Sequence, residues 1–176
     1  MPHTKSMTSR ERVLATIAHQ EPDRVPVDLG ATPSSGISAI AYYTLKRHLG
    51  VTSGHTRVYD VVQQLAQPED DILDRFGVDT IELGRGFALD DESWSPWTLP
   101  DGTPCFVPAW TPIERDDNHW VIRSKSGRVL AHMPDGALYF EQTYFPFLEG
   151  DDLDAISDVL GEYMWTAIAS PPGPVD

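Results

Sequence analysis

The chain has 176 residues, and its 27 acidic against 13 basic side chains give a formal net charge of −14 at pH 7. This length suits one ordinary domain but is short for a (β/α)8 barrel, which typically needs roughly 250 residues. The charge argues against nucleic acid and anionic membrane surfaces as partners, because both are bound through Lys and Arg.

Neither a membrane span nor a secretory signal is predicted. No stretch approaches the roughly 20 apolar residues that a spanning helix requires, and the polar start at residues 1–9 lacks the apolar core of a signal peptide. We therefore expect a cytoplasmic protein. Cys105 is the only cysteine, so no internal disulfide is expected, and its strand-like surroundings favour structural packing over reactivity.

The first part of the chain is predicted to alternate helix with strand. Thr8 and Glu11 have capping-box spacing before a helical stripe that Pro22 ends, and residues 25–29 alternate as a short strand would. Further predictions are helices over residues 37–49 and 58–65, a helix from Pro68 to Gly77, and a buried strand over residues 78–83. This order, with short connections, is typical of parallel βα units.

The second part has the pattern of an antiparallel meander. Turn signals at Asp101-Gly102, Ser126-Gly127 and Asp135-Gly136 accompany strand-like runs over residues 120–123, 128–131 and 137–140. Four of the five tryptophans fall here, at positions 94, 97, 110 and 120. We favour a small core over a ligand-stacking wall for them. A helix over residues 149–169 and a Pro-rich end follow, so we expect three segments: 1–93, 94–147 and 148–176.

Two motifs carry a resemblance to a known family. Residues 8–28 read TSRERVLATIAHQEPDRVPVD, and residues 74–79 read DRFGVD. Together with the Trp-rich hairpins and the GDDLD of residues 150–154, they resemble the uroporphyrinogen decarboxylase family, in its corrinoid-dependent methyltransferase-like branch. The resemblance implies an α/β fold: the incomplete N-terminal part of a (β/α)8 barrel, with an antiparallel β-rich insertion after the second strand.

For activity, the resemblance implies a zinc- and corrinoid-linked methyltransferase. A small-molecule methyl donor, a corrinoid protein and a thiol or folate acceptor would be its partners. That branch builds its zinc site from one His and two Cys near the end of a longer sequence. The six histidines here lack H-x-H or H-x-x-x-H spacing and Cys105 has no second cysteine, so we predict no metal site in this chain. Zinc and corrinoid are implied only for a longer protein.

Porphyrinogen decarboxylation is the alternative activity within the family. True decarboxylases resemble one another in a segment whose arginines hold the substrate carboxylates, as a guanidinium fork does well. The corresponding residues 25–35 read VPVDLGATPSS and contain no arginine. This difference makes the decarboxylase the less favoured activity.

Candidate site residues follow from the barrel expectation, because active residues of barrels lie at the C-terminal ends of strands. Asp28, Asp79 and Glu82 are the candidate acids or bases, and Arg85 and Gly30 are the candidate substrate-binding residues. Structural roles remain open for all five: Asp28 can cap a turn, Glu82 can pair with Arg85, and the glycine can serve a tight turn.

The leading hypothesis is thus the N-terminal portion of a methyltransferase that is inactive alone. The rival hypotheses are a non-catalytic binding or interaction domain, with the Trp-rich meander as its surface, and a truncated, partly ordered fragment. Two barrel strands cannot close and would leave unpaired edges, so self-association into a homo-oligomer is a further expectation.

Overall fold

The computed structural model describes residues 6–82, 90–148 and 153–163. Its helices are α1 (Ser9–Ile17), α2 (Ala39–His48), α3 (Asp70–Arg75) and α4 (Leu153–Val159). Its strands are β1 (Ile37–Ser38), β2 (Val58–Asp60), β3 (Leu65–Ala66), β4 (Trp94–Thr98), β5 (Pro104–Pro108), β6 (Ile113–Asp116), β7 (His119–Arg123), β8 (Val129–Pro134) and β9 (Glu141–Gln142). Short 3-10 helices cover Pro33–Ser35, Asp91–Ser93, Pro146–Leu148 and Leu160–Glu162.

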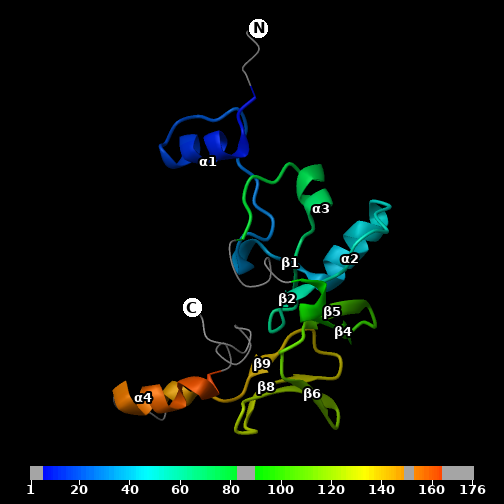
Figure 1. Ribbon diagram of the computed structural model, residues 1–176, viewed down its shortest axis with the longest axis vertical. Coiled ribbons are helices and arrows are strands. Elements are labelled where there is room, and N and C mark those ends of the chain that lie inside the picture. Colours follow the sequence, from blue (N-terminus) through cyan, green and yellow to red (C-terminus); the bar gives the residue numbers. More distant parts are fainter. Residues whose placement is uncertain (1–5, 83–89, 149–152, 164–176) are drawn as a thin grey trace.

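These strands form three antiparallel sheets, in the orders β1-β3-β2, β4-β5 and β6-β7-β8-β9. Helix α1 lies at one end of the elongated molecule, β6, β8 and β9 lie toward the other end, and β4 and β5 lie between (Figure 1). The prediction of an α/β fold, an incomplete (β/α)8 barrel, is therefore wrong for the described residues: the structure is rich in antiparallel sheet, with few and short helices.

One source of the error is the apolar run that we predicted as a helix over residues 58–65. It is the β2–β3 hairpin, and Val58, Tyr59, Val61 and Val62 are all buried. The Asp60 carboxylate accepts the Gln63 N–H at 2.9 Å, which stabilises a turn in place of a helical hydrogen bond. Buried β-branched residues on such a short run favour a strand.

The second source is the pair of predicted parallel strands at residues 25–29 and 78–83. The described parts of both lack strand assignment, although the Asp79 N–H donates to the Val27 carbonyl at 2.8 Å. Pro26 has no N–H, and the N–H of Val27 is bound by the Asp79 carboxylate at 2.9 Å. A continuous ladder of backbone hydrogen bonds therefore does not form.

Local signals predicted several elements correctly. Helix α1 begins with the expected capping box, in which Thr8 Oγ1 accepts the Glu11 N–H at 3.2 Å and the Glu11 carboxylate accepts the Thr8 N–H at 2.8 Å. Helix α2 matches the helix predicted over residues 37–49, and Ser38 caps it. The signals at Asp101-Gly102 and Ser126-Gly127 lie in the turns of the β4–β5 and β7–β8 hairpins.

The meander differs from its prediction at its far edge. Residues 137–140, expected as a strand, lie in the connection that follows Asp135-Gly136, and the edge strand β9 pairs with β8 instead. Trp94 is buried, and the half-buried Trp97 and Trp120 rings meet edge to face at 5.6 Å. The core role that we predicted for these three tryptophans is confirmed.

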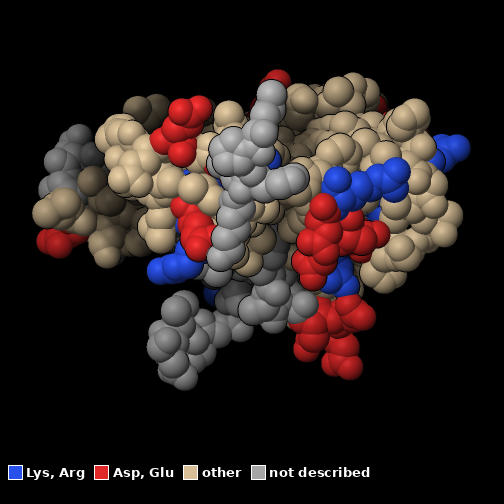
Figure 2. Space-filling view, turned by 90° about the horizontal axis from the view of Figure 1, so that it is seen from above, with Lys and Arg blue, Asp and Glu red and all other residues tan. Residues whose placement is uncertain are grey.

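One apolar core is shared by α2 and by the three sheets, β1-β3-β2, β4-β5 and β6-β7-β8-β9. Its fully buried members include Tyr42 of α2, Val58 of β2, Ile122 of β7 and Leu130 of β8. Among the described residues, no helix has the length and apolar character needed to cross a bilayer. Viewed from above, acidic and basic side chains lie interspersed among uncharged surface (Figure 2).

Candidate functional site

Asp79, one of the predicted catalytic residues, lies at the centre of an ion-pair cluster. Its side chain is 0% exposed and pairs with Arg12 and with Arg24, whose Nη1 is 2.6 Å from Asp79 Oδ2. Burial alone would raise the pKa of Asp79, but hydrogen bonds from the Val27 N–H, Arg24, Ser9 and Arg12 lower it to about 2. A carboxylate held in this way is a poor acid or base near neutral pH, which favours a structural role.

The same cluster contains residues from both motifs that carry the family resemblance. Arg12 also binds Asp23, with its Nε 2.7 Å from Oδ1 and its Nη2 3.0 Å from Oδ2. This bidentate pair is the main reason that the pKa of Asp23 falls below its usual range. Arg12, Asp23 and Arg24 belong to the first motif and Asp79 to the second. We call these four residues the Asp79 cluster; it fastens α1 to the segment that follows α3.

The other predicted site residues have structural contacts as well. Asp28 Oδ1 accepts the Ala31 N–H and the Thr80 hydroxyl, both at 3.0 Å, so it caps a turn. Burial would raise the pKa of Asp28, but hydrogen bonds including these two lower it. Gly30 has φ 84°, and a Cβ there would lie 2.9 Å from the Pro68 ring. Glu82 is half-buried, and Arg85 lies outside the described residues.

The zinc site implied by the resemblance finds no suitable donors in the part of the chain that the structure describes. There, no three His, Cys, Asp or Glu side chains are grouped so that they could hold a metal ion. Cys105 is 2% exposed, and burial raises the pKa of its thiol to about 12. A metal-binding cysteine must be a thiolate, which this environment disfavours. The described donors therefore do not fit the implied zinc.

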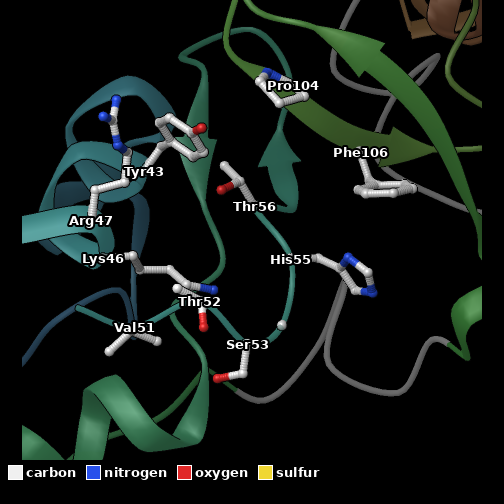
Figure 3. A pocket seen from close by; sticks show the side chains of 11 residues that line it. Tyr43, Lys46, Arg47, Val51, Thr52, Ser53, His55, Thr56, Pro104 and Phe106 are labelled. Atoms are coloured by element: carbon white, nitrogen blue, oxygen red, sulfur yellow. The ribbon is translucent and has the colours of Figure 1, made fainter. Parts of the chain in front are cut away.

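A concave site lies elsewhere, between the C-terminal end of α2, the loop of residues 51–56 and strand β5 (Figure 3). Its volume of about 380 Å³ falls within the range of ligand pockets, roughly 300–1,000 Å³. We call it the α2–β5 pocket. Its lining includes no carboxylate, although the chain as a whole is strongly acidic.

The end of α2 turns the chain into this pocket. Gly50 has φ 70°, its N–H donates to the Arg47 carbonyl at 3.1 Å, and the Val51 N–H donates to the Lys46 carbonyl at 2.9 Å. These two bonds form a Schellman motif, which needs a left-handed residue and reverses the chain direction. The loop therefore runs back beside the last turn of the helix.

One carboxylate clamps the loop onto the helix. Glu69 forms an ion pair with Lys46, accepts the Tyr42 hydroxyl at 3.3 Å and accepts the His55 N–H at 2.7 Å. The loop approaches so closely that a Cβ on Gly54 would lie 1.9 Å from Glu69 Oε1. A Cβ here would displace the Glu69 carboxylate, and the φ of 69° is one that glycine adopts readily, so both features favour glycine at this position.

Strand β5 supplies the opposite wall. The Phe106 N–H donates to the Thr56 carbonyl at 2.9 Å, which holds the loop against the strand. The Phe106 ring meets the His55 ring edge to face at 4.9 Å, and Pro104 lies along the same wall. The pocket thus has a wall of rings as well as a charged helix end.

The two cations on α2 have different surroundings. The Lys46 ammonium is buried and paired with Glu69. Arg47 is exposed, its guanidinium lies 5.9 Å from the centre of the Tyr43 ring, and it forms no ion pair with another described residue. Within the described part of the chain, the Arg47 guanidinium at the pocket is therefore not balanced by a carboxylate.

Sequence reasoning missed this pocket. Its residues match no catalytic or metal-binding spacing, and the nearest signals are the basic run at 46–48, Gly50 and the polar loop that follows. No protein-family model, curated protein or solved structure matches the chain. The resemblance to the uroporphyrinogen decarboxylase family therefore stays a prediction.

Proposed function

We propose that this chain binds a small organic anion in the α2–β5 pocket. The observation that carries the proposal is the Arg47 guanidinium, which lies without a described carboxylate partner at a concave site whose lining includes no acidic residue. A binding domain is a rival hypothesis from the sequence, with the tryptophan-rich meander as its surface. We keep that function but place the binding surface at the α2–β5 pocket.

Local charge outweighs the acidity of the whole chain at such a site. Exposed charges more than about 10 Å apart are largely screened at 0.1 M salt, so the pocket lining dominates. A guanidinium binds a carboxylate or phosphate through two parallel hydrogen bonds, each contributing about 1.5–3 kcal/mol when charged. We expect dissociation constants between about 1 µM and 1 mM.

The test is a titration of the full chain with acetate, succinate, inorganic phosphate and phenylacetate, followed by the backbone amide signals of residues 52–56. We expect saturable shifts with at least one of these anions, and their loss in Arg47→Gln. Lys125→Gln is the matched control, because it removes one positive charge from an exposed turn far along the chain. Shifts that never saturate, or that survive in Arg47→Gln, contradict the proposal.

A second candidate is a role in the zinc- and corrinoid-linked methyltransferase that the resemblance implies. The observation in its favour is that the two resembling motifs, separated by about 50 residues, meet in the Asp79 cluster. Separate motifs that form one cluster are more specific than either motif alone. Porphyrinogen decarboxylation is less favoured, since residues 25–35 carry no arginine.

Zinc and corrinoid content and methyl transfer to a small thiol test this candidate, measured on this chain and on any longer product of the same locus. Activity and metal confined to a longer product support it. A longer product that binds neither zinc nor corrinoid and transfers no methyl group removes it.

A further inference from the structure

The α2–β5 pocket has two chemically different sides. Lys46, Thr52 and Ser53 lie on one side in Figure 3, whereas Pro104 and Phe106 lie on the opposite side, with His55 close to Phe106. Tyr43 lies toward the end where Arg47 is found. A ligand that satisfies both sides needs a charged or hydrogen-bonding end and an apolar end.

The charge balance limits how many negative charges the ligand brings. Glu69 neutralises Lys46, which leaves Arg47 as the permanent charge without a described carboxylate partner. A monocarboxylate matches a single guanidinium in charge and in its two acceptor oxygens. A phosphate monoester carries about −1.5 to −2 at pH 7 and would leave part of its charge unmatched.

The ring wall limits the shape of the apolar end. Phe106 is half-buried, its ring meets the His55 ring edge to face at 4.9 Å, and its backbone N–H donates to the Thr56 carbonyl. Aromatic faces and edges pack best against another flat ring, because ring quadrupoles favour offset and edge-to-face arrangements. A bulky saturated group gains burial at this wall but no such geometry.

We infer that the ligand of the α2–β5 pocket is a flat aromatic monocarboxylate, bound with its carboxylate at Arg47 and its ring against Phe106. This inference rests on the proposed anion-binding function and adds the ligand class. Lys46 acts as a positioning residue here: paired with Glu69, it holds the loop in place rather than binding the anion.

A series of matched probes tests the inference by calorimetry on the full chain. Phenylacetate carries both a ring and one negative charge, acetate lacks the ring, phenylacetamide lacks the charge, cyclohexylacetate lacks the flatness, and phenyl phosphate carries more charge. We expect phenylacetate to bind about tenfold tighter than either acetate or phenylacetamide, and at least as tightly as phenyl phosphate.

Variants assign each preference to its residue. Arg47→Gln should abolish the preference for phenylacetate over phenylacetamide, and Phe106→Leu should abolish its preference over cyclohexylacetate. Leucine keeps most of the buried volume, and the midpoint of thermal unfolding checks that Phe106→Leu is folded. Lys125→Gln should leave all affinities unchanged.

The outcomes separate this inference from the function on which it rests. Equal binding of acetate, cyclohexylacetate and phenylacetate, lost in Arg47→Gln, would leave an anion site but overturn the aromatic ligand. If phenyl phosphate binds tenfold more tightly than phenylacetate, the inference that the ligand carries a single negative charge is wrong. Saturable binding by none of the probes would overturn the ligand class, and the same result with phosphate and succinate would overturn the proposed function as well.

Discussion

The Asp79 cluster and the α2–β5 pocket both contain basic side chains, but these side chains differ in whether they are paired with carboxylates. In the cluster, Arg12 and Arg24 are matched by Asp23 and Asp79, and Arg12 is only 4% exposed. In the pocket, Lys46 is paired with Glu69, whereas the exposed Arg47 has no carboxylate partner among the described residues. A conspicuous charged motif can thus hold the fold together, whereas the inconspicuous Arg47 is the residue at which we propose that an anion binds.

The two regions should therefore respond differently to mutation. Removing a partner from the cluster takes one charge from a largely buried set of ion pairs, so stability falls while the pocket keeps its chemistry. Removing Arg47 takes a charge from the surface, so ligand affinity falls while stability changes by less than about 0.5 kcal/mol.

Among these variants, Asp79→Asn should lower the free energy of unfolding the most. The substitution keeps the shape but leaves Arg12 and Arg24 short of a negative charge, and the loss of one partner of a buried pair costs about 3–5 kcal/mol. Urea unfolding measures this loss. Asp117→Asn, in the exposed β6–β7 turn, is the matched control and should change stability by less than about 0.5 kcal/mol. A loss under about 1 kcal/mol for Asp79→Asn would show that the cluster is not structural.

Acid should weaken the cluster in a defined range of pH. The folded pKa of Asp79 is lowered to about 2 and that of Asp23 is lowered as well, against about 3.9 in an unfolded chain. Their contribution is therefore present above about pH 4 and is lost as the pH falls toward about 2.

The difference in unfolding free energy between wild type and Asp79→Asn isolates this contribution from the relief of the −14 net charge. The difference should shrink between pH 5 and pH 3, mainly below about pH 4. A difference that stays constant over this range would mean that the Asp79 carboxylate has the same pKa in both states.

Gly54→Ala tests whether Glu69 holds the loop of the α2–β5 pocket in place. Gly54 and Gly127 both have positive φ, 69° and 88°, but only at Gly54 does a Cβ meet the Glu69 carboxylate; at Gly127 nothing lies within 4 Å. The left-handed backbone alone costs alanine about 1–2 kcal/mol, so Gly127→Ala should lose that much. Gly54→Ala should lose more and should also weaken anion binding, because either the loop or the Glu69 carboxylate that holds it must move. Equal losses in the two variants would contradict the clamp.

Alkylation of Cys105 should show the smallest effect, namely little reaction while the chain is folded. Its thiol is 2% exposed with a pKa raised to about 12, so alkylation should be slow in the folded chain and complete after unfolding in urea. A saturating pocket ligand should slow it further, since binding stabilises the folded state. Rapid labelling of the folded chain would show that β5, and hence the ring wall, opens readily.

What the sequence predicted well was local. The capping box at Thr8 and Glu11 and the turn signals at Asp101-Gly102 and Ser126-Gly127 depend on neighbouring residues, and each lies where it was predicted. The run at 58–65 was predicted wrongly, because a short apolar stretch fits a buried helix and a buried strand equally well. The error in the fold class followed from that run and from two extended segments that do not form a ladder.

The partners of the charged residues could not be predicted for a different reason, which is distance along the chain. Asp79 is a predicted catalytic residue, and the sequence does not show that Arg12 and Arg24, more than 50 residues earlier, form ion pairs with it. Arg47 looked no different from Lys46 until Glu69 paired with one of them and not the other. No local pattern states which charges find partners in the folded chain.

The most direct test of the account is a phenylacetate titration of wild type, Arg47→Gln and Asp79→Asn under conditions where all three are folded, followed at the amides of residues 52–56. We expect saturable shifts in wild type and in Asp79→Asn, and at least about tenfold weaker binding in Arg47→Gln. Binding that is lost in Asp79→Asn and kept in Arg47→Gln would contradict it, and would place the functional site at the cluster.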